Sequence, residues 1–251
     1  MVDENCRGRG SPGDRQSFRE DGGVNVDQLT SAERSTRRMM RVIVWTVIFA
    51  IAMAFVESAV VVYLRALAHG GPFVAAGSAL LPPQLLGIEV AREAATLVML
   101  AALACVAGRA RWERHMVFWL AFATWDLAYY GWLWVLIRWP PSLLAWDVLF
   151  LIPVPWTAPV LAPVLVSVGL LAGVGVVVQL RVASKRPRFG ARSVGATILG
   201  GLVVFGSFVV DVGTTVHGQA PDHYHWELFM LGALIAGAGF AAAVRAAEAA
   251  E

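Results

Sequence analysis

Six apolar segments dominate the chain, and each is close to the ~20 residues that an α-helix needs to cross a bilayer. Of the 251 residues, 58% are hydrophobic and 15% are charged, whereas soluble domains carry roughly 25% charged residues. The pattern therefore predicts an all-α fold, a polytopic membrane helix bundle with six transmembrane helices. The expected helices cover about residues 42–66, 86–108, 115–137, 158–181, 193–216 and 226–246.

The first forty residues differ from the rest of the chain in composition. They are polar, rich in glycine and without hydrophobic periodicity, which predicts a disordered cytoplasmic tail over residues 1–40. The first apolar run starts near Val42 and is longer than the core of a secretory signal, so we expect no cleaved signal peptide. Residues 41–251 are then expected to form one six-helix transmembrane domain.

A proline-rich stretch interrupts the series of long apolar segments. Residues 139–157 have an apolar centre that is too short to cross a membrane, and pairs of prolines bracket this centre. Irregular backbone inside a bilayer is tolerated only when it packs in protein or lines a wet cavity. We therefore expect a short interfacial or re-entrant segment on the outer side of the membrane.

Lysine and arginine residues set the expected orientation, because the cytoplasmic loops of membrane proteins are enriched in them. The segment before the first helix, the loop at 109–114 and the loop at 181–192 are all rich in basic residues. These segments fall on one side of the membrane, which predicts that both termini are cytoplasmic. Basic loops of this kind are typical of contact with anionic lipid, so we expect no nucleic-acid partner.

Acidic residues occur inside several of the apolar segments, where a carboxylate costs about 3 kcal/mol and by default indicates a functional site. Counting along the helices at ~1.5 Å per residue places most of them in the outer half of the bilayer. Protons, histidines, a metal ion or a cationic ligand must balance this charge, because few basic residues share the same half. The acids of this half are Glu57, Glu89, Glu93, Asp126, Asp147, Asp211, Asp222 and Glu227, and its arginines are Arg65, Arg92 and Arg138.

The candidate site residues fall into three groups by the chemistry that they offer. Glu57, Glu93 and Asp126 are candidate catalytic acids or bases, with a buried structural network as the alternative. His223 and His225 alternate with Glu227, and a carboxylate with two or three imidazoles is a common ligand set for zinc, iron or copper, although solvated loop histidines are the simpler alternative. The candidate metal ligands are Asp211, His217, His223 and His225, and the candidate ligand-binding or charge-balancing residues are Arg65, Arg92, Arg138, Tyr129, Tyr130 and Asp147.

Three functions are compatible with this chemistry. The first is a site in the outer half of the membrane that binds a metal ion or a polar ligand; an enzyme with such a site would be a metal-dependent membrane hydrolase or oxidase. The second is a structural or accessory subunit that binds other membrane subunits and uses the acids as internal salt bridges. The third is a proton- or cation-coupled transporter.

Three stretches of the sequence resemble a group of uncharacterised bacterial multi-pass membrane proteins. They are FVESAVVVYLR at 55–65, IEVAREAATLVML at 88–100, and WDVLFLIPVPW followed by PVLAPV at 146–164. The resemblance implies the same helical membrane fold and a location in a bacterial inner (plasma) membrane. It implies no activity, cofactor or catalytic residue.

Overall fold

The computed structural model describes residues 26–67, 83–185, 187–217 and 221–248. The chain forms two units, Met1–Arg37 and Arg38–Glu251. The described part of the first unit is the beginning of helix α1 (Val26–Leu67). The second unit holds the remainder of α1 and the other helices and strands.

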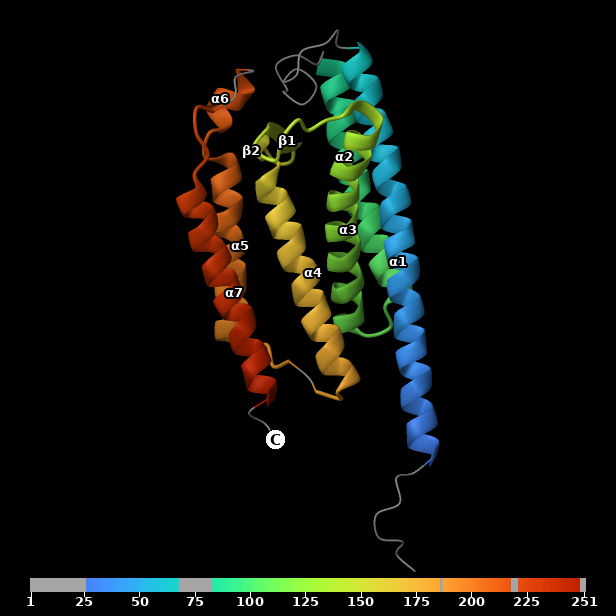
Figure 1. Ribbon diagram of the computed structural model, residues 1–251. Helices are drawn as coiled ribbons and strands as arrows, with labels where there is room; N and C mark the ends of the chain where they lie inside the picture. Colours follow the sequence, from blue (N-terminus) through green and yellow to red (C-terminus); the bar gives the residue numbers. More distant parts are fainter. Residues whose placement is uncertain (1–25, 68–82, 186, 218–220, 249–251) are drawn as a thin grey trace, which may run out of the picture. The chain divides into compact units, whose positions relative to one another are not determined.

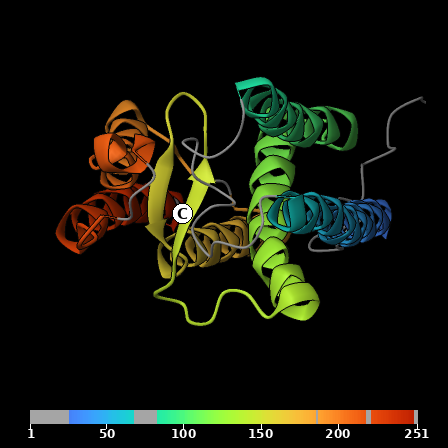
Figure 2. The same cartoon turned by 90° about the horizontal axis from the view of Figure 1, so that it is seen from above.

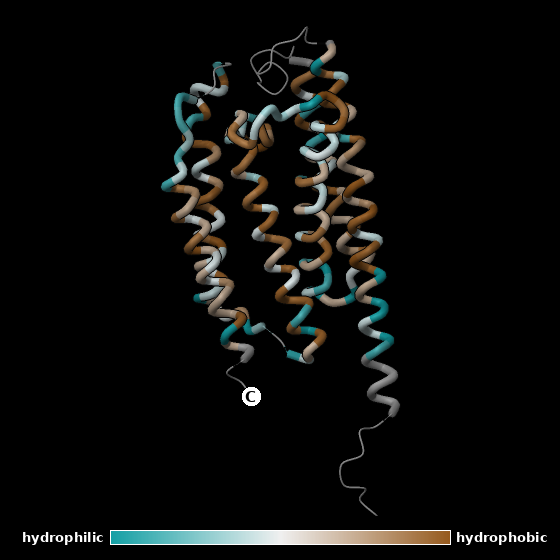
Figure 3. Tube along the Cα trace, in the orientation of Figure 1, coloured by the Kyte–Doolittle hydropathy of each residue, from teal (hydrophilic) through white to brown (hydrophobic). Residues whose placement is uncertain are grey.

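The expected all-α membrane fold is confirmed. Among the described residues, six helices are long and apolar enough to cross a membrane, and Figure 3 shows apolar residues along them and hydrophilic residues near their ends. The protein is therefore an integral, multi-pass membrane protein whose helices contact the lipid bilayer. The six helices are α1 (Val26–Leu67), α2 (Pro83–Ala107), α3 (Arg111–Ile137), α4 (Leu161–Val182), α5 (Ala191–Val209) and α7 (Trp226–Glu248).

Helix α1 begins well before its apolar part, which corrects the expected tail in part. Residues 26–40, which we expected to be disordered, are helical, whereas residues 1–25 lie outside the described part of the chain. The stretch 33–40 contains Glu, Arg and Met, which are good helix formers. It leads directly into an apolar helix, so that its extension needs no new and costly nucleus.

The proline-rich stretch forms a β-hairpin, whose strands we did not predict. Strand β1 (Trp146–Phe150) pairs antiparallel with β2 (Trp156–Pro159). Helix α3 ends just before the hairpin, where Arg138 adopts a left-handed conformation with a φ of 56°. The two prolines at 140–141 prevent the helix from continuing. Figure 2 shows the hairpin between the α5–α7 pair and helices α1 to α3.

The fifth apolar segment ends earlier than we expected. Helix α5 stops at Val209, and a separate short helix, α6 (Val212–Val216), follows. Asp211 lies between the two helices with φ −99° and ψ 25°, so the expectation of a helix through residue 216 was wrong. The residues beyond Asp211 include a glycine and two β-branched threonines, which favour helix weakly.

The helices of the second unit pack in neighbouring pairs, α2 with α3, α3 with α4, and α5 with α7. Helix α1 joins them through a core in which Ala50 and Ala54 pack with Leu100 and Ala121. Strand β2 contacts α4, α5 and α6. We call the end of this unit that carries the hairpin the hairpin end (Figure 1). Helices α1, α3 and α5 finish there, and α2, α4 and α7 start there.

Candidate functional site

A cavity of about 140 Å³ lies at the hairpin end, among helices α1 to α5 and the hairpin. Five carboxylates and two guanidiniums line it, so that acidic residues of three helices and one strand meet there. The candidates from the sequence that the structure brings together in this cavity are Glu57, Glu93, Asp126, Arg65, Arg92, Tyr129, Tyr130 and Asp147, and Glu89 joins them.

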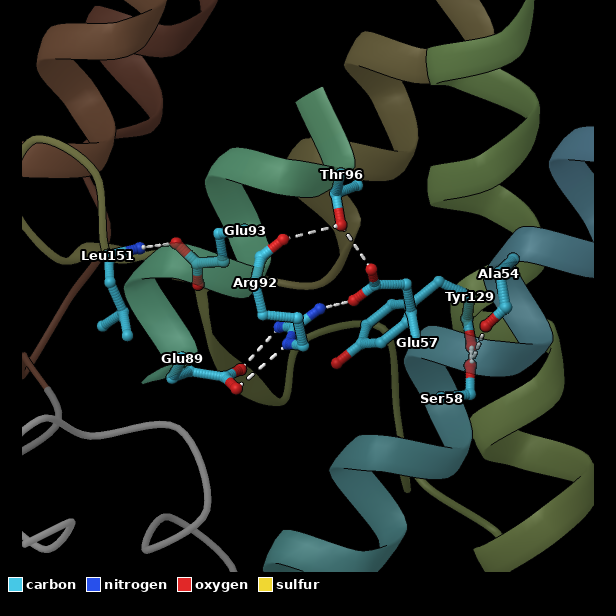
Figure 4. Close-up of polar contacts among 9 residues, drawn as sticks. All are labelled: Ala54, Glu57, Ser58, Glu89, Arg92, Glu93, Thr96, Tyr129 and Leu151. Carbon is cyan, nitrogen blue, oxygen red and sulfur yellow. Dashed lines mark hydrogen bonds and ion pairs between the residues drawn. The ribbon is translucent and has the colours of Figure 1, made fainter. Parts of the chain in front are cut away.

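Arg92 is the centre of an ion-pair network between α1 and α2 (Figure 4). Its guanidinium contacts the carboxylate of Glu57 on α1 and, at 2.5 Å, the carboxylate of Glu89 one turn earlier on α2. The hydroxyl group of Thr96 donates a hydrogen bond to the carboxylate of Glu57. Glu57 is only 6% exposed, so a cation rather than water balances its charge.

Glu93 lies one turn after Glu89 on α2 but reaches the hairpin. Its Oε2 atom accepts a hydrogen bond of 2.7 Å from the backbone N–H of Leu151. The residue is 7% exposed, and within the described part of the chain no cationic group lies within ion-pair distance of it. The hydrogen bond that holds Glu93 therefore comes from a neutral donor.

Two further carboxylates in the cavity accept hydrogen bonds from hydroxyl groups. Ser167 donates to Asp126 at 2.7 Å, and Tyr130 donates to Asp147 at 3.1 Å. Asp147 lies on β1, and its burial raises the pKa of its carboxyl group to about 7, although the Arg65 guanidinium opposes this shift. Like Glu93, both aspartates lack an ion pair among the residues that the structure describes.

Two arginines at the hairpin end stack on tryptophan rings but differ in their relation to the cavity. Arg65 lines the cavity and places its Cζ atom 4.1 Å from the centroid of Trp139. Its Nε atom is buried without a hydrogen-bond partner, and no described carboxylate lies within ion-pair distance of the guanidinium. Arg138 stacks on Trp134 at 4.3 Å, and it is not part of the cavity lining.

Aromatic rings complete the wall of the cavity. The ring of Phe150 lies 6.0 Å from that of Trp125 and 5.3 Å from that of Trp156, measured between centroids. The indole N–H groups of both tryptophans are buried and have no acceptor among the described residues. Aromatic faces attract cations, so this wall favours a positively charged occupant.

The predicted metal ligands do not line this cavity. His225 lies 3.4 Å from Asp211 through Nε2 and 2.9 Å from Glu227 through Nδ1, and its ring centroid is 4.9 Å from that of His223. His217 contacts a backbone carbonyl of α6 at 2.6 Å instead. In the described ranges, no group of three or more His, Cys, Asp or Glu side chains is arranged to hold a metal ion.

Sequence reasoning missed the groups that hold the carboxylates in position. Thr96 lies four residues after Arg92, hence on the same helix face. This spacing predicts that Thr96 is a polar neighbour of the groups around Arg92. Ser167 is a hydroxyl group within an apolar segment, which is a weaker signal of the same kind. The backbone N–H of Leu151 gives no signal in the sequence, because its position depends on the hairpin.

Comparison of the chain with protein-family models, with curated proteins and with solved structures finds no match.

Proposed function

We propose that this integral membrane protein binds a small cationic ligand in the cavity at its hairpin end. The observation that carries the proposal is the charge of the lining, five carboxylates against two guanidiniums. Arg92 is already engaged by two of the carboxylates. Glu93, Asp126 and Asp147 are left with neutral hydrogen-bond donors.

The burial of Glu93 and Asp147 and the partial burial of Asp126 support the need for a cation. An ionised carboxylate that is taken out of water without a counter-charge costs several kcal/mol, so it either takes up a proton or recruits a positive partner. The aromatic rings of Trp125, Phe150 and Trp156 favour an organic ammonium ion, because its positive charge is attracted to ring faces. The volume of about 140 Å³ limits the bound part of the ligand to a small group.

We further propose that the hairpin end faces the periplasm and that the protein lies in a bacterial inner membrane. Basic residues at the opposite end of the bundle, including Arg109, Arg114, Arg188 and Arg192, support this orientation. The ligand would then reach the cavity from the outer side of the membrane.

An ion pair and an apolar core lie at the end of the bundle opposite the hairpin. At the end opposite the hairpin, Arg38 on α1 pairs with Glu113 on α3 at 3.0 Å. Met116 and Val117 form an apolar core beside this pair. A transporter would have to open both layers. An accessory subunit, in which the Arg92 network serves stability alone, would co-purify with a membrane partner and would bind no cation.

The metal site at Asp211, His217, His223 and His225 remains a separate prediction. His225 already lies beside Asp211, which is the part of this set that the structure brings together. Elemental analysis of untagged protein tests it. Zinc, iron or copper at one equivalent, lost in the Asp211→Ala/His217→Ala double variant, would support the metal site and redirect the search toward hydrolase or oxidase chemistry.

The cation proposal is tested by thermal unfolding of the detergent-purified protein. We expect tetramethylammonium chloride to raise the unfolding temperature beyond an equal concentration of sodium chloride, because a ligand that binds the native state stabilises it. Asp126→Asn and Glu93→Gln keep a hydrogen-bond acceptor but remove the charge. Each variant should unfold at the same temperature in the two salts. Asp222→Asn, at an exposed position, is the matched control and should retain the difference between the salts. Equal shifts by the two salts in the wild-type protein would contradict the proposal.

A further inference from the structure

We infer that the ligand of the cavity is a zwitterion, with an ammonium group at one end and an anionic oxygen group at the other. This inference rests on the proposed cation binding and adds the second half of the ligand. It starts from Arg65, the cavity-lining guanidinium that has no ion-pair partner among the described residues. An anionic oxygen group on the ligand would give this guanidinium a direct ion-pair partner.

The stacking of Arg65 on Trp139 prepares it to bind an anion. The ring covers one face of the guanidinium at 4.1 Å and restrains the side chain. The N–H groups of a guanidinium lie in its plane and point away from its edges, so stacking leaves them able to bind carboxylate or phosphate oxygens. Arg92 does not offer this, because two carboxylates already occupy its N–H groups.

The same cavity carries the acceptors for the ammonium group. Glu93 and Asp126 line it and accept hydrogen bonds from neutral donors. Asp147 lines it as well. Because these carboxylates and Arg65 line one cavity of about 140 Å³, one small molecule can contact both kinds of group.

Two sources supply this chemistry, the ethanolamine headgroup of a phospholipid and a free amino acid. Both combine an ammonium group with an anionic oxygen group a few bonds away. Three soluble probes separate the alternatives. They are ethanolamine, which is a cation only; glycerophosphoethanolamine, which carries the headgroup chemistry; and β-alanine, which carries the amino-acid chemistry.

The experiment measures the affinity of the purified full-length protein for each probe by isothermal titration calorimetry. At least one zwitterion should bind about tenfold or more tightly than ethanolamine, because charge-assisted hydrogen bonds to a guanidinium are strong. Arg65→Gln should lower the affinity for that zwitterion to the affinity for ethanolamine, and it should leave ethanolamine binding unchanged. Arg138→Gln is the matched control, because Arg138 also stacks on a tryptophan but does not line the cavity. It should change neither affinity.

The outcomes separate this inference from the proposed function. Ethanolamine that binds as tightly as both zwitterions, or a zwitterion preference that survives Arg65→Gln, would overturn the zwitterion inference alone. Absence of ethanolamine binding, with no effect of Asp126→Asn on any probe, would overturn the cation site as well. Tighter binding of glycerophosphoethanolamine than of β-alanine would identify the lipid headgroup as the source, and the reverse order would identify an amino acid.

Discussion

The carboxylate of Glu93 on α2 accepts a hydrogen bond of 2.7 Å from the backbone N–H of Leu151, the residue that follows β1. The contact joins a membrane-spanning helix to the hairpin across 58 positions of sequence. It satisfies a backbone donor that has left regular strand pairing, which is required wherever such a group is shielded from water. It also fixes one wall of the cavity.

Substitution separates the hydrogen bond of Glu93 from its charge. Glu93→Gln keeps an acceptor for Leu151 and should retain most of the stability, whereas Glu93→Ala should lower the free energy of unfolding by about 1–3 kcal/mol, since it leaves the N–H without a partner. Denaturant unfolding in mixed micelles measures both values. Equal losses in the two variants would show that this hydrogen bond does not anchor the hairpin.

Protonation of Asp147 should make stability depend on pH. Burial raises the pKa of this carboxyl group to about 7 from an ordinary value of 3.8. Between these values the native state binds more protons than the unfolded state, so stability is fully present below about pH 4 and is lost as the pH rises through about 7. We expect a higher unfolding temperature at pH 5 than at pH 8. Asp147→Asn should flatten this difference, and Asp222→Asn should preserve it.

Removal of Arg92 should lower the free energy of unfolding, because Arg92 neutralises two carboxylates. Arg92→Met leaves Glu57 and Glu89 without their counter-charge, and breaking a buried pair in this way costs about 3–5 kcal/mol. Adding Glu57→Gln to the same chain should restore part of the lost stability. A double-mutant cycle of unfolding free energies measures the coupling, and simple additivity of the two changes would argue against the network.

The contact between α5 and α7 requires glycine at one position but not at its neighbour. A Cβ atom at Gly200 would lie 2.5 Å from the backbone oxygen of Gly232, whereas a Cβ at Gly201 would meet no atom within 4 Å. Gly200→Ala should therefore cost about 1–3 kcal/mol through overpacking. Gly201→Ala should be neutral or stabilise by about 0.5–1 kcal/mol. Thermal unfolding of the two variants distinguishes them, and similar stabilities would contradict the close helix approach.

Much of the bundle and part of the site follow from the sequence, because both depend on local periodicity. The length of each apolar run predicts a membrane-spanning helix, and a constant rise per residue gives the depth of its polar side chains. These depths predicted that Glu57, Glu93 and Asp126 share one layer, and all three line the same cavity. Glu89 and Arg92 lie three residues apart on one helix, a spacing that favours the ion pair that they form.

The parts that the sequence did not reveal depend on contacts between distant segments. The strands of the hairpin at 146–159 are short and joined by a loop with two prolines, and their partners include Thr215, whose hydroxyl lies 2.6 Å from that of Thr157. The early end of α5 brings this threonine beside the hairpin, so the helix break and the strand pairing occur together. Asp211 was misplaced for this reason, since hydropathy alone does not distinguish a continuous helix from two helices with a break.

The pairing of β1 with β2 connects the charge of the cavity to the position of the α5–α7 pair. Asp147 is opposite Ala158, and the neighbouring position Thr157 bonds to Thr215. Successive side chains of a strand point to opposite faces, so a register slip of one residue would reverse the faces of one strand relative to the other. A slip that turned β1 would move Asp147 out of the cavity, whereas a slip that turned β2 would break the hydroxyl contact that ties α6 to the hairpin. The register of this one strand pair thus holds in place both an acid of the cavity and the attachment of the short helix between α5 and α7.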